Sequence, residues 1–427
     1  MREFFEGLIL EPLELKGVID SGAEEELYRR GGQEAAKEAL AKRWESADEQ
    51  RDLECQECGE QMGALGSRGR RLQTLCGTMK IDRQVYYCAR CGRTEAPLDE
   101  RLGITEGGMT PGLMRVVCRT ALEMPYEQSE SLLTDTLGFC PCSGREIERV
   151  AKRHGEKIER SEGIVESAKV ARPPRPPRRR RKKARYCAAI DAVMIPGLPD
   201  AEKHCLVWHD VKVGVVFDRT EIDPSTYVAG RERVEAFGNR FWNHLQSRGL
   251  DEKDFCLVLG DGATWIWNLA DLHLPGVPQL LDFYHASEHL YGTARAVWPK
   301  KTADLWWDRR KQQLKEGELG NFFASLKWLE RSHSKNYKGE EAQSPARLLG
   351  YFEENRERLI YRWALDHRLP IGSGAVESAC RHIVQQRLKL SGMRWSDVGA
   401  QAILNLRTLH RNGEFEAYWE GSQAASF

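Results

Sequence analysis

The chain lacks any long hydrophobic run. None of the apolar stretches in its 427 residues approaches the roughly 18 residues that a membrane-spanning helix needs. It also lacks a secretory hydrophobic segment after Met1. These two absences favour an intracellular protein, and we expect it in the cytoplasm without a membrane partner.

A net charge is also missing, since Lys+Arg and Asp+Glu both total 64. The sum hides an asymmetry, because residues 1–62 contain 17 acidic and 8 basic side chains, whereas residues 144–185 contain 16 basic and 6 acidic ones. Such a basic segment favours a polyanionic partner. The length exceeds what one hydrophobic core usually supports, so we expect about two to four structural units.

A disulfide framework is not expected, because the 12 cysteines of an intracellular chain favour metal binding or buried thiols. Four of them form two Cys-x-x-Cys pairs, and a glycine suited to a tight turn follows each pair. Two such pairs can complete a closed tetrahedral thiolate shell. We therefore predict one structural Zn²⁺ on Cys55, Cys58, Cys88 and Cys91. A strand over residues 78–87 should enter the second pair.

The other eight cysteines lack this pairing, and we interpret most of them as small buried hydrophobic residues. They are Cys76, Cys118, Cys140, Cys142, Cys187, Cys205, Cys256 and Cys380.

Two segments have helical patterns. Residues 1–53 have a helical pattern that Gly31–Gly32 interrupts. The sequence does not indicate what this segment does. Residues 110–158 carry apolar stripes, with one set around Leu113 and another that includes Ser129, Leu132 and Leu133. Pro125 divides these sets, and Ser143 can cap a last helix. Its outward basic residues, Arg145, Arg149, Lys152 and Arg153, are typical of a helix-turn-helix DNA reader. A plain helical bundle with a solvated basic face is the alternative.

Residues 172–185 contain nine cations and four prolines in fourteen positions. Proline prevents helix formation, so this segment should be an extended linker. Its cations would contact DNA phosphates, chiefly through the block Arg178, Arg179, Arg180, Arg181, Lys182 and Lys183. A solvated hinge is the alternative interpretation.

After the linker the sequence turns to an α/β pattern. Strands are expected over 186–195, 205–217, 255–260 and 279–283, with a helix over 228–250 and further helices later. Asp191 falls inside a strand, where a carboxylate is costly unless it meets a cation. Asp261 follows a strand's carboxyl end, where α/β sheets place ligands.

A third carboxylate stands in a helix's first turn. Gly372 and Gly374 break the preceding segment, Ser373 can cap the helix, and no glycine or proline occurs from 375 to 390. Glu377 then lies where the helix dipole favours negative charge. Asp191, Asp261 and Glu377 offer hard oxygen ligands that select Mg²⁺ or Mn²⁺. An ordinary amphipathic helix is the alternative for this last stretch.

Taken in order, these motifs resemble the DDE transposases of bacterial insertion sequences, with the Kra-type family as the closest match. The resemblance rests on Ala-Ile-Asp191-Ala, Leu-Gly-Asp261-Gly-Ala, Asp282-Phe-Tyr-His285, Gly-Ser-Gly-Ala-Val-Glu377-Ser and Arg387-Leu-Lys389-Leu-Ser-Gly-Met-Arg394-Trp395. It extends over almost the whole chain, and the motifs around Glu377 are the most specific.

The resemblance implies a multidomain α/β protein with an RNase H-like mixed-sheet catalytic domain that carries an α-helical insertion. The expected order is a helical segment (1–53), a zinc ribbon (54–105), a helix-turn-helix domain (106–171), a basic linker (172–185), the first part of the catalytic core (186–290), the insertion (291–364), the second part of the core (365–412) and a tail (413–427). The insertion contains Trp298, Trp306, Trp307, Trp328 and Trp363. Asp282 and His285 match a structural motif of the family.

The implied chemistry is two-metal phosphoryl transfer on DNA. Asp191 would bridge two Mg²⁺ ions, which Mn²⁺ could replace, and Asp261 and Glu377 would each hold one. Besides the helix and the linker, Arg387, Lys389, Arg394 and Trp395 are expected to contact DNA. The partners would be double-stranded transposon ends and target DNA, bound by a homodimer or higher assembly near the bacterial nucleoid. A DNA-binding regulator derived from such an enzyme, or a nuclease that cuts without joining, are the alternatives.

Overall fold

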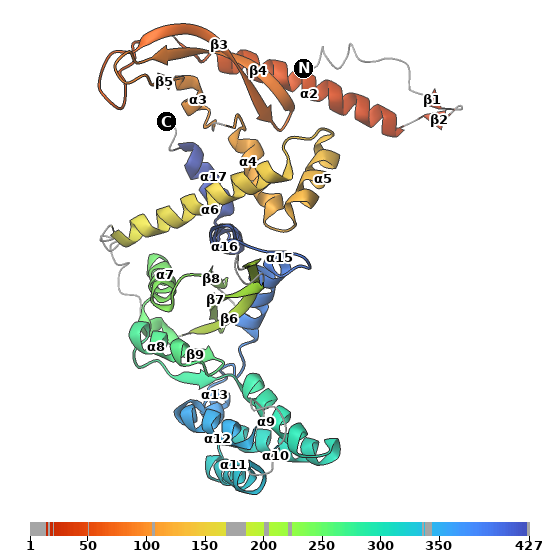
Figure 1. Ribbon diagram of the computed structural model, residues 1–427, viewed down its shortest axis with the longest axis vertical. Coiled ribbons are helices and arrows are strands. Elements are labelled where there is room, and N and C mark those ends of the chain that lie inside the picture. The colour runs from red at the N-terminus through yellow and green to blue at the C-terminus, as the bar shows by residue number, and fades with distance from the viewer. Residues whose placement is uncertain are drawn as a thin grey trace. The chain divides into compact units, whose positions relative to one another are not determined.

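The structure is a computed structural model of the chain. It describes residues 14–15, 18–19, 21–49, 51–104, 107–167, 185–199, 205–220, 224–334, 337 and 344–424. Contacts within the chain define two compact units, Met1–His154 with Glu414–Phe427 and Gly155–Gly413; Figure 1 labels their elements. In the described ranges we find no helix with the length and apolar character to cross a membrane.

The first unit begins with a short strand pair and a long helix. β1 (Glu14–Leu15) and β2 (Val18–Ile19) pair antiparallel, and α2 (Ser21–Glu45) follows. Contrary to expectation, α2 continues through both glycines at 31 and 32. Its Leu40 and Trp44 pack against a buried cluster made of Leu72, Met79, Ile81 and Leu98. Tertiary packing of this kind offsets the roughly 1 kcal/mol that each glycine costs in a helix.

A hairpin forms the sheet of this unit. β3 (Gly63–Thr74) pairs antiparallel with β4 (Gly77–Tyr87), and β5 (Thr94–Glu95) extends the β4 edge before α3 (Pro97–Arg101). The strand predicted over 78–87 is therefore confirmed. A β-bulge lies at Ala64/Gly66, opposite Val85 and Tyr86. Tyr86 is buried and Tyr87 exposed, because successive side chains of a strand point to opposite faces.

Three helices follow in the predicted helical segment, namely α4 (Pro111–Ala121), α5 (Tyr126–Leu137) and α6 (Gly144–Ser167). Pro125 is the N-cap of α5, as its dividing position suggested. Leu113 and Leu133 are buried, whereas Leu132 is 42% exposed. The second stripe is therefore narrower than expected. α17 (Phe415–Ala424) also belongs to this unit, where Glu416 pairs with Arg115 at 2.8 Å.

The second unit contains a mixed five-stranded sheet, which confirms the predicted α/β pattern. Its order is β10 (Gln279–Leu281), β9 (Phe255–Gly260), β6 (Tyr186–Pro199), β7 (Leu206–Asp218) and β8 (Thr226–Gly230). The pairs β6–β7 and β7–β8 are antiparallel, while β6–β9 and β9–β10 are parallel. β6 is the central strand. β8 occupies the start of the range expected to be helical, because pairing with β7 satisfies its backbone, and α7 begins only at Val234.

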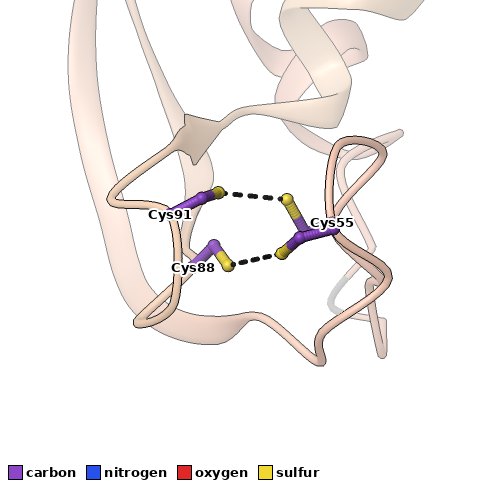
Figure 2. Close-up of side chains that lie close together, drawn as sticks. Cys55, Cys88 and Cys91 are labelled. Atoms are coloured by element: carbon purple, nitrogen blue, oxygen red, sulfur yellow. Dashed lines mark hydrogen bonds between the residues drawn. The ribbon is translucent and has the colours of Figure 1, made fainter.

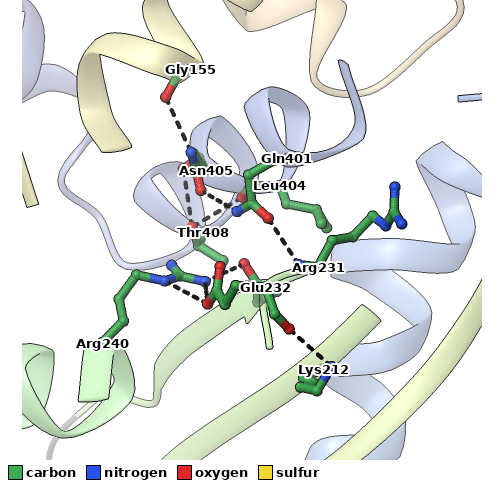
Figure 3. Close-up of polar contacts among 10 residues, drawn as sticks. Gly155, Lys212, Arg231, Glu232, Arg240, Gln401, Leu404, Asn405 and Thr408 are labelled. Atoms are coloured by element: carbon green, nitrogen blue, oxygen red, sulfur yellow. Dashed lines mark hydrogen bonds and ion pairs between the residues drawn. The ribbon is translucent and has the colours of Figure 1, made fainter. Parts of the chain in front are cut away.

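Helices surround this sheet: α7 (Val234–Ser247), α8 (Thr264–His273), α9 (Phe283–Val297) and α16 (Asp397–Arg411), with a 3₁₀ turn, η1 (Glu252–Asp254), before β9. α16 is buried continuously from 400 to 408. Figure 3 shows how its polar side chains are satisfied. Gln401 accepts a hydrogen bond from the Arg231 amide at 2.8 Å and donates to Asn405 at 2.7 Å, and Asn405 donates to the Gly155 carbonyl at 3.1 Å. The network fixes α16 beside β8.

The elements that the structure describes between β10 and residue 373 are helices, which agrees with the helical character expected of residues 291–364. After α9 they are α10 (Lys300–Glu316), α11 (Leu319–His333), α12 (Pro345–Glu354), the 3₁₀ turn η4 (Arg356–Arg358) and α13 (Tyr361–Asp366). Phe322 and Phe352 meet edge to face at 4.9 Å between α11 and α12. Trp307 donates to the Ser287 hydroxyl at 2.8 Å and so ties α10 to α9.

The expected single helix over 375–390 is divided into three pieces: α14 (Gly374–Ala379), a π-helical turn η5 (Cys380–Gln385) and α15 (Gln386–Leu388). Ser373 is the N-cap residue, but its side chain accepts no capping hydrogen bond. The hydroxyl donates instead to Glu377 at 3.3 Å. π-Helical turns are often found at functional sites.

Candidate functional site

The four predicted cysteine ligands converge. Cys55 and Cys58 precede β3, and Cys88 and Cys91 follow β4, so the hairpin brings both pairs to its open end. The Cys55–Cys91 and Cys58–Cys88 Sγ distances are both 3.5 Å. Figure 2 shows the side chains pointing toward one another. All four Sγ atoms lie within 4.8 Å of one another, so this cluster could hold a metal ion such as zinc.

The two turns that carry the cysteines share one local geometry. The Gly59 amide donates to the Cys55 carbonyl and the Gly92 amide donates to the Cys88 carbonyl, both at 2.9 Å. Both glycines have a positive φ, 70° and 74°, which a side chain would disfavour. A backbone hydrogen bond from Cys91 also lowers the pKa of the Cys88 thiol to about 7, despite burial. The turn after β4 thus favours the metal-binding thiolate form at Cys88, whereas the pKa values of Cys58 and Cys91 are raised.

Two of the predicted acidic residues are brought together by strand pairing. β6 and β9 are parallel neighbours, and their last pair is Ala189 with Leu259. Asp191 and Asp261 each lie two residues beyond this pair. Asp191 is still in β6, opposite Val213 of β7, whereas Asp261 has left β9 and accepts the Ala263 amide at 2.9 Å. Both side chains are half-buried at the place where the two strands diverge.

Asp282 links the end of β9, where Asp261 lies, to the segment that carries Glu377. Its carboxylate is fully buried and accepts the His285 amide at 2.8 Å, capping α9, and also the Ser373 amide. The Asp282 amide donates to the Gly260 carbonyl at 2.7 Å. One residue therefore connects the end of β9 with the N-cap of α14. This geometry agrees with the structural role expected for the Asp282 and His285 motif.

Glu377 lies exposed in the first turn of α14, as predicted. The π-helical turn that follows directs Cys380 toward the sheet, where its Sγ lies 3.8 Å from an oxygen of Asp191. Burial raises the pKa of the Cys380 thiol, and the charges of Asp191 and Glu377 add to this effect. Cys380 therefore lies near both carboxylates. It is buried, as interpreted from the sequence, but its contact with Asp191 was not foreseen.

Asp191 and Asp261 lie close enough for their charges to interact, and Asp191 and Glu377 both act on the Cys380 thiol, but the three carboxylates do not form a tight cluster. In the described residues, the cysteine quartet is the one group of three or more His, Cys, Asp or Glu side chains with ligand atoms within 4.8 Å of one another. Burial raises the pKa of Asp191, and the nearby charge of Asp261 adds to this effect. The Ala192 amide, a 2.6 Å donor to the same carboxylate, acts in the opposite direction. Asp191 is thus a partly buried acid whose negative charge lacks full compensation.

A chain of contacts through one tyrosine and two histidines starts at Asp261. The Tyr351 hydroxyl donates to the Asp261 carbonyl at 2.8 Å, and the Tyr351 ring contacts His289 with centroids 4.6 Å apart. His289 and His285 face each other, with Nε2 atoms 3.2 Å apart. Burial lowers the pKa of His289, and His285 lowers it further. Tyr351 was not recognised in the sequence, because 90 positions separate it from Asp261 and no local motif marks it.

The predicted basic face of α6 is present. Arg145, Arg149 and Lys152 are exposed and Arg153 is half-buried, while Ile147, Val150 and Ala151 are buried on the other side. Arg149 forms an ion pair with Glu146 of the same helix. The Ser143 hydroxyl accepts the Glu146 amide at 3.4 Å, which agrees with the expected cap. Arg145 and Lys152 are thus exposed cations of this helix, and Arg149 is exposed but paired with Glu146.

The basic residues after Glu377 do not share one environment. Lys389 and Arg394 are exposed, but Arg387 is fully buried, with its guanidinium 4.9 Å from the ring centroid of Trp395. Trp395 is only 6% exposed and donates to the Leu388 carbonyl at 3.0 Å. Its backbone also bonds to Pro196 and Leu198. The structure therefore corrects the expectation that Arg387 and Trp395 contact DNA: they pack inside the unit and fasten residues 387–395 to β6.

The block Arg178, Arg179, Arg180, Arg181, Lys182 and Lys183 lies outside the described residues, as does the linker except for Arg185. Arg185 stands directly before β6, and its amide donates to the Asp254 carbonyl at 3.0 Å.

Comparison with known proteins does not add an identification. No family model matches the chain, and no curated protein matches it either.

Proposed function

We propose that this protein is a DNA transposase that binds the ends of an insertion sequence and catalyses Mg²⁺-dependent strand cleavage and strand transfer. Asp191, Asp261 and Glu377 would be its catalytic carboxylates. The observation that carries the proposal is their placement. Parallel pairing of β6 with β9 aligns the two aspartates, and the buried Asp282 links the end of β9 to the helix of Glu377.

The strand order supports an RNase H-like assignment for the catalytic domain. Three antiparallel strands come first in the chain, and two parallel strands follow on the other side of β6. The closed cysteine cluster supports a zinc ribbon with one structural Zn²⁺. The helices α4 to α6, with the exposed cations of α6, support a helix-turn-helix that binds DNA.

The acidic residues fit a divalent cation, because they are oxygen donors and Asp191 carries a partly uncompensated charge in the sheet. Two Mg²⁺ ions, or Mn²⁺, would activate water or a DNA 3′-OH and stabilise the leaving oxygen. Asp191 would hold both ions, and Asp261 and Glu377 one each. Asp282 would orient the Glu377 helix through the Ser373 amide, and Tyr351 would hold the Asp261 backbone. Chemistry of this kind needs no covalent enzyme intermediate.

Contacts with DNA would come from Arg145, Arg149, Lys152 and Arg153 of α6, from the linker block at 178–183, and from Lys389 and Arg394. We place the protein on double-stranded transposon ends and target DNA, as a homodimer or a higher assembly near the nucleoid in the bacterial cytoplasm.

The experiment that tests this function uses the DNA that flanks the gene. Incubation with Mg²⁺ should produce cuts at the element's ends and joined products. Asp191→Asn, Asp261→Asn and Glu377→Gln should each reduce cleavage by several orders of magnitude while DNA binding persists, because each side chain would serve the same pair of ions. The triple variant should be no worse than a single one. Asp271→Asn, an exposed substitution on α8, is the matched control.

The same assay separates the alternatives. A regulator would bind the DNA without cleaving it, and the three substitutions would leave its DNA binding unchanged. A nuclease would cut in a carboxylate-dependent way without joined products. Cleavage that survives any of the single substitutions would contradict the proposed mechanism.

A further inference from the structure

A groove in the helical insertion has features of a ligand site that the proposed catalytic residues do not explain. Helices α10 and α11 border an open groove with a volume of about 710 Å³. Pockets for small ligands are commonly about 300–1,000 Å³. The lining residues are Trp306, Arg309, Arg310, Gln312, Gln313, Glu316, Glu318, Asn321, Ala324, Ser325 and Trp328.

The floor of the groove contains buried polar atoms. Arg310 and Gln313 are each 6% exposed, and among the described residues neither Nε of Arg310 nor Oε1 of Gln313 has a hydrogen-bond partner. No described acidic side chain forms an ion pair with Arg310. Burial lowers the pKa of Arg310, and Arg309 lowers it further. Since an uncompensated buried cation is costly, the site is suited to an anion.

Aromatic rings stand beside this cation. The Arg310 guanidinium lies 5.3 Å from the ring centroid of Trp306. Trp298 contacts Trp306 with centroids 5.5 Å apart and lies nearly parallel to Trp328, at 6.5 Å and 15°. Trp328 is 55% exposed. A tryptophan left this exposed in a cluster of aromatic rings offers a stacking surface to a planar group.

The two ends of the groove also differ in charge. α10 and α11 meet at Gly317, so Glu316 and Glu318 lie at the turn. Trp306 and Trp328 lie ten residues away from them along their helices, near the opposite end. Gln312 donates to Glu316 at 2.9 Å and Asn321 donates to Glu318 at 3.2 Å, so the acidic end has its own partners. An anion would therefore bind at Arg309 and Arg310, next to the rings.

We propose that this groove binds one nucleotide, with its phosphate on Arg310 and Arg309 and its base against Trp328. Aromatic rings beside cations are how proteins hold unpaired nucleotides without reading their sequence. Two sources share this chemistry: an unpaired nucleotide in a DNA strand and a free nucleotide. The DNA source rests on the proposed function, whereas the nucleotide chemistry rests on the groove alone.

Two binding measurements on the full-length protein test the proposal. Calorimetric titration with deoxyadenosine monophosphate reports the free-nucleotide site, and fluorescence polarisation with a labelled single-stranded oligonucleotide reports the strand. Trp328→Ala should weaken binding by about five- to 150-fold, the range for loss of one base–aromatic stack. Arg310→Gln should weaken it as well. Leu305→Ala and Arg331→Gln, exposed substitutions outside the groove lining, should leave both affinities unchanged.

Weaker binding of both the mononucleotide and the oligonucleotide supports the DNA source. Weakening for the mononucleotide alone supports the site and overturns the DNA source. Affinities that do not change in Trp328→Ala overturn the proposal. This variant alters an exposed side chain, so the test holds even where Arg310→Gln fails to fold. Neither measurement requires catalysis, so loss of cleavage in the carboxylate variants and loss of nucleotide binding in the groove variants are separate outcomes.

Discussion

The cysteine cluster and the three carboxylates differ in how the chain assembles them. The cysteines stand on two tight turns joined by one hairpin, and backbone hydrogen bonds within each turn position the sulfur atoms. The carboxylates come from a central strand, a strand end and a helix, and 116 positions separate Asp261 from Glu377. The comparison teaches that a site built on local turns forms with its hairpin, whereas the acidic site depends on the whole second unit.

The largest expected effect is the loss of zinc and of the fold around the cysteine cluster. Cys58→Ser should abolish zinc binding and unfold residues 53–102, because structural zinc sites contribute about 10–16 kcal/mol of apparent binding energy in small peptides. Elemental analysis and circular dichroism would measure this. Cys76→Ser, at the opposite end of the hairpin, is the matched control and should keep its zinc. A Cys58→Ser protein that retains zinc would show that the cluster is not the metal site.

The next effect tests how the acidic site is assembled. Asp282→Ala should destabilise the second unit by about 2–5 kcal/mol, because two buried backbone N–H groups lose their acceptor and α9 loses its cap. Cleavage should fall together with stability, since the Glu377 helix loses its link to the sheet. Thermal unfolding and the cleavage assay would report both. Glu235→Ala, which removes an exposed carboxylate on α7, should change neither. Unchanged stability in Asp282→Ala would contradict the linking role.

The smallest expected effect is a gain in stability, whereas the two substitutions above are expected to destabilise the protein. Asp191→Asn should stabilise the protein when no Mg²⁺ is added, because burial and Asp261 raise the pKa of Asp191. A carboxyl with a raised folded-state pKa stabilises the fold while protonated, and this contribution is lost as the pH rises through that pKa. The advantage of the Asn variant should therefore be absent at low pH and appear as the pH increases.

Melting temperatures measured across the pH range would show this advantage, at about 2–4 °C for each kcal/mol gained. Asp210→Asn on β7 is the matched control. Although burial opposes it, the hydrogen bond from Lys212 at 2.6 Å lowers the pKa of Asp210, so that substitution should destabilise slightly. An Asp191→Asn protein that melts below the parent at neutral pH would show that the carboxylate is already compensated.

Features that depend on local chemistry were predictable from the sequence. The Cys-x-x-Cys spacing predicted the cysteine cluster, and the apolar runs predicted the strands of the mixed sheet, because turn geometry and strand alternation are local properties. The positions of Asp191, Asp261 and Glu377 on a strand, a strand end and a helix were also predictable. Their participation in transposition stays a prediction.

Which side chains are buried, and which residues contact one another, depends on the packing of the folded chain. A basic motif after Glu377 indicated DNA contacts, but Arg387 is buried against the ring of Trp395, whose backbone bonds to β6. Packing outweighs the preference of a cation for water when a ring covers it. Three other features could not be predicted from the sequence either: the π-helical turn at Cys380, the link through Asp282 and the Tyr351 contact with Asp261. Each joins residues far apart in the chain, and no local pattern encodes such a contact.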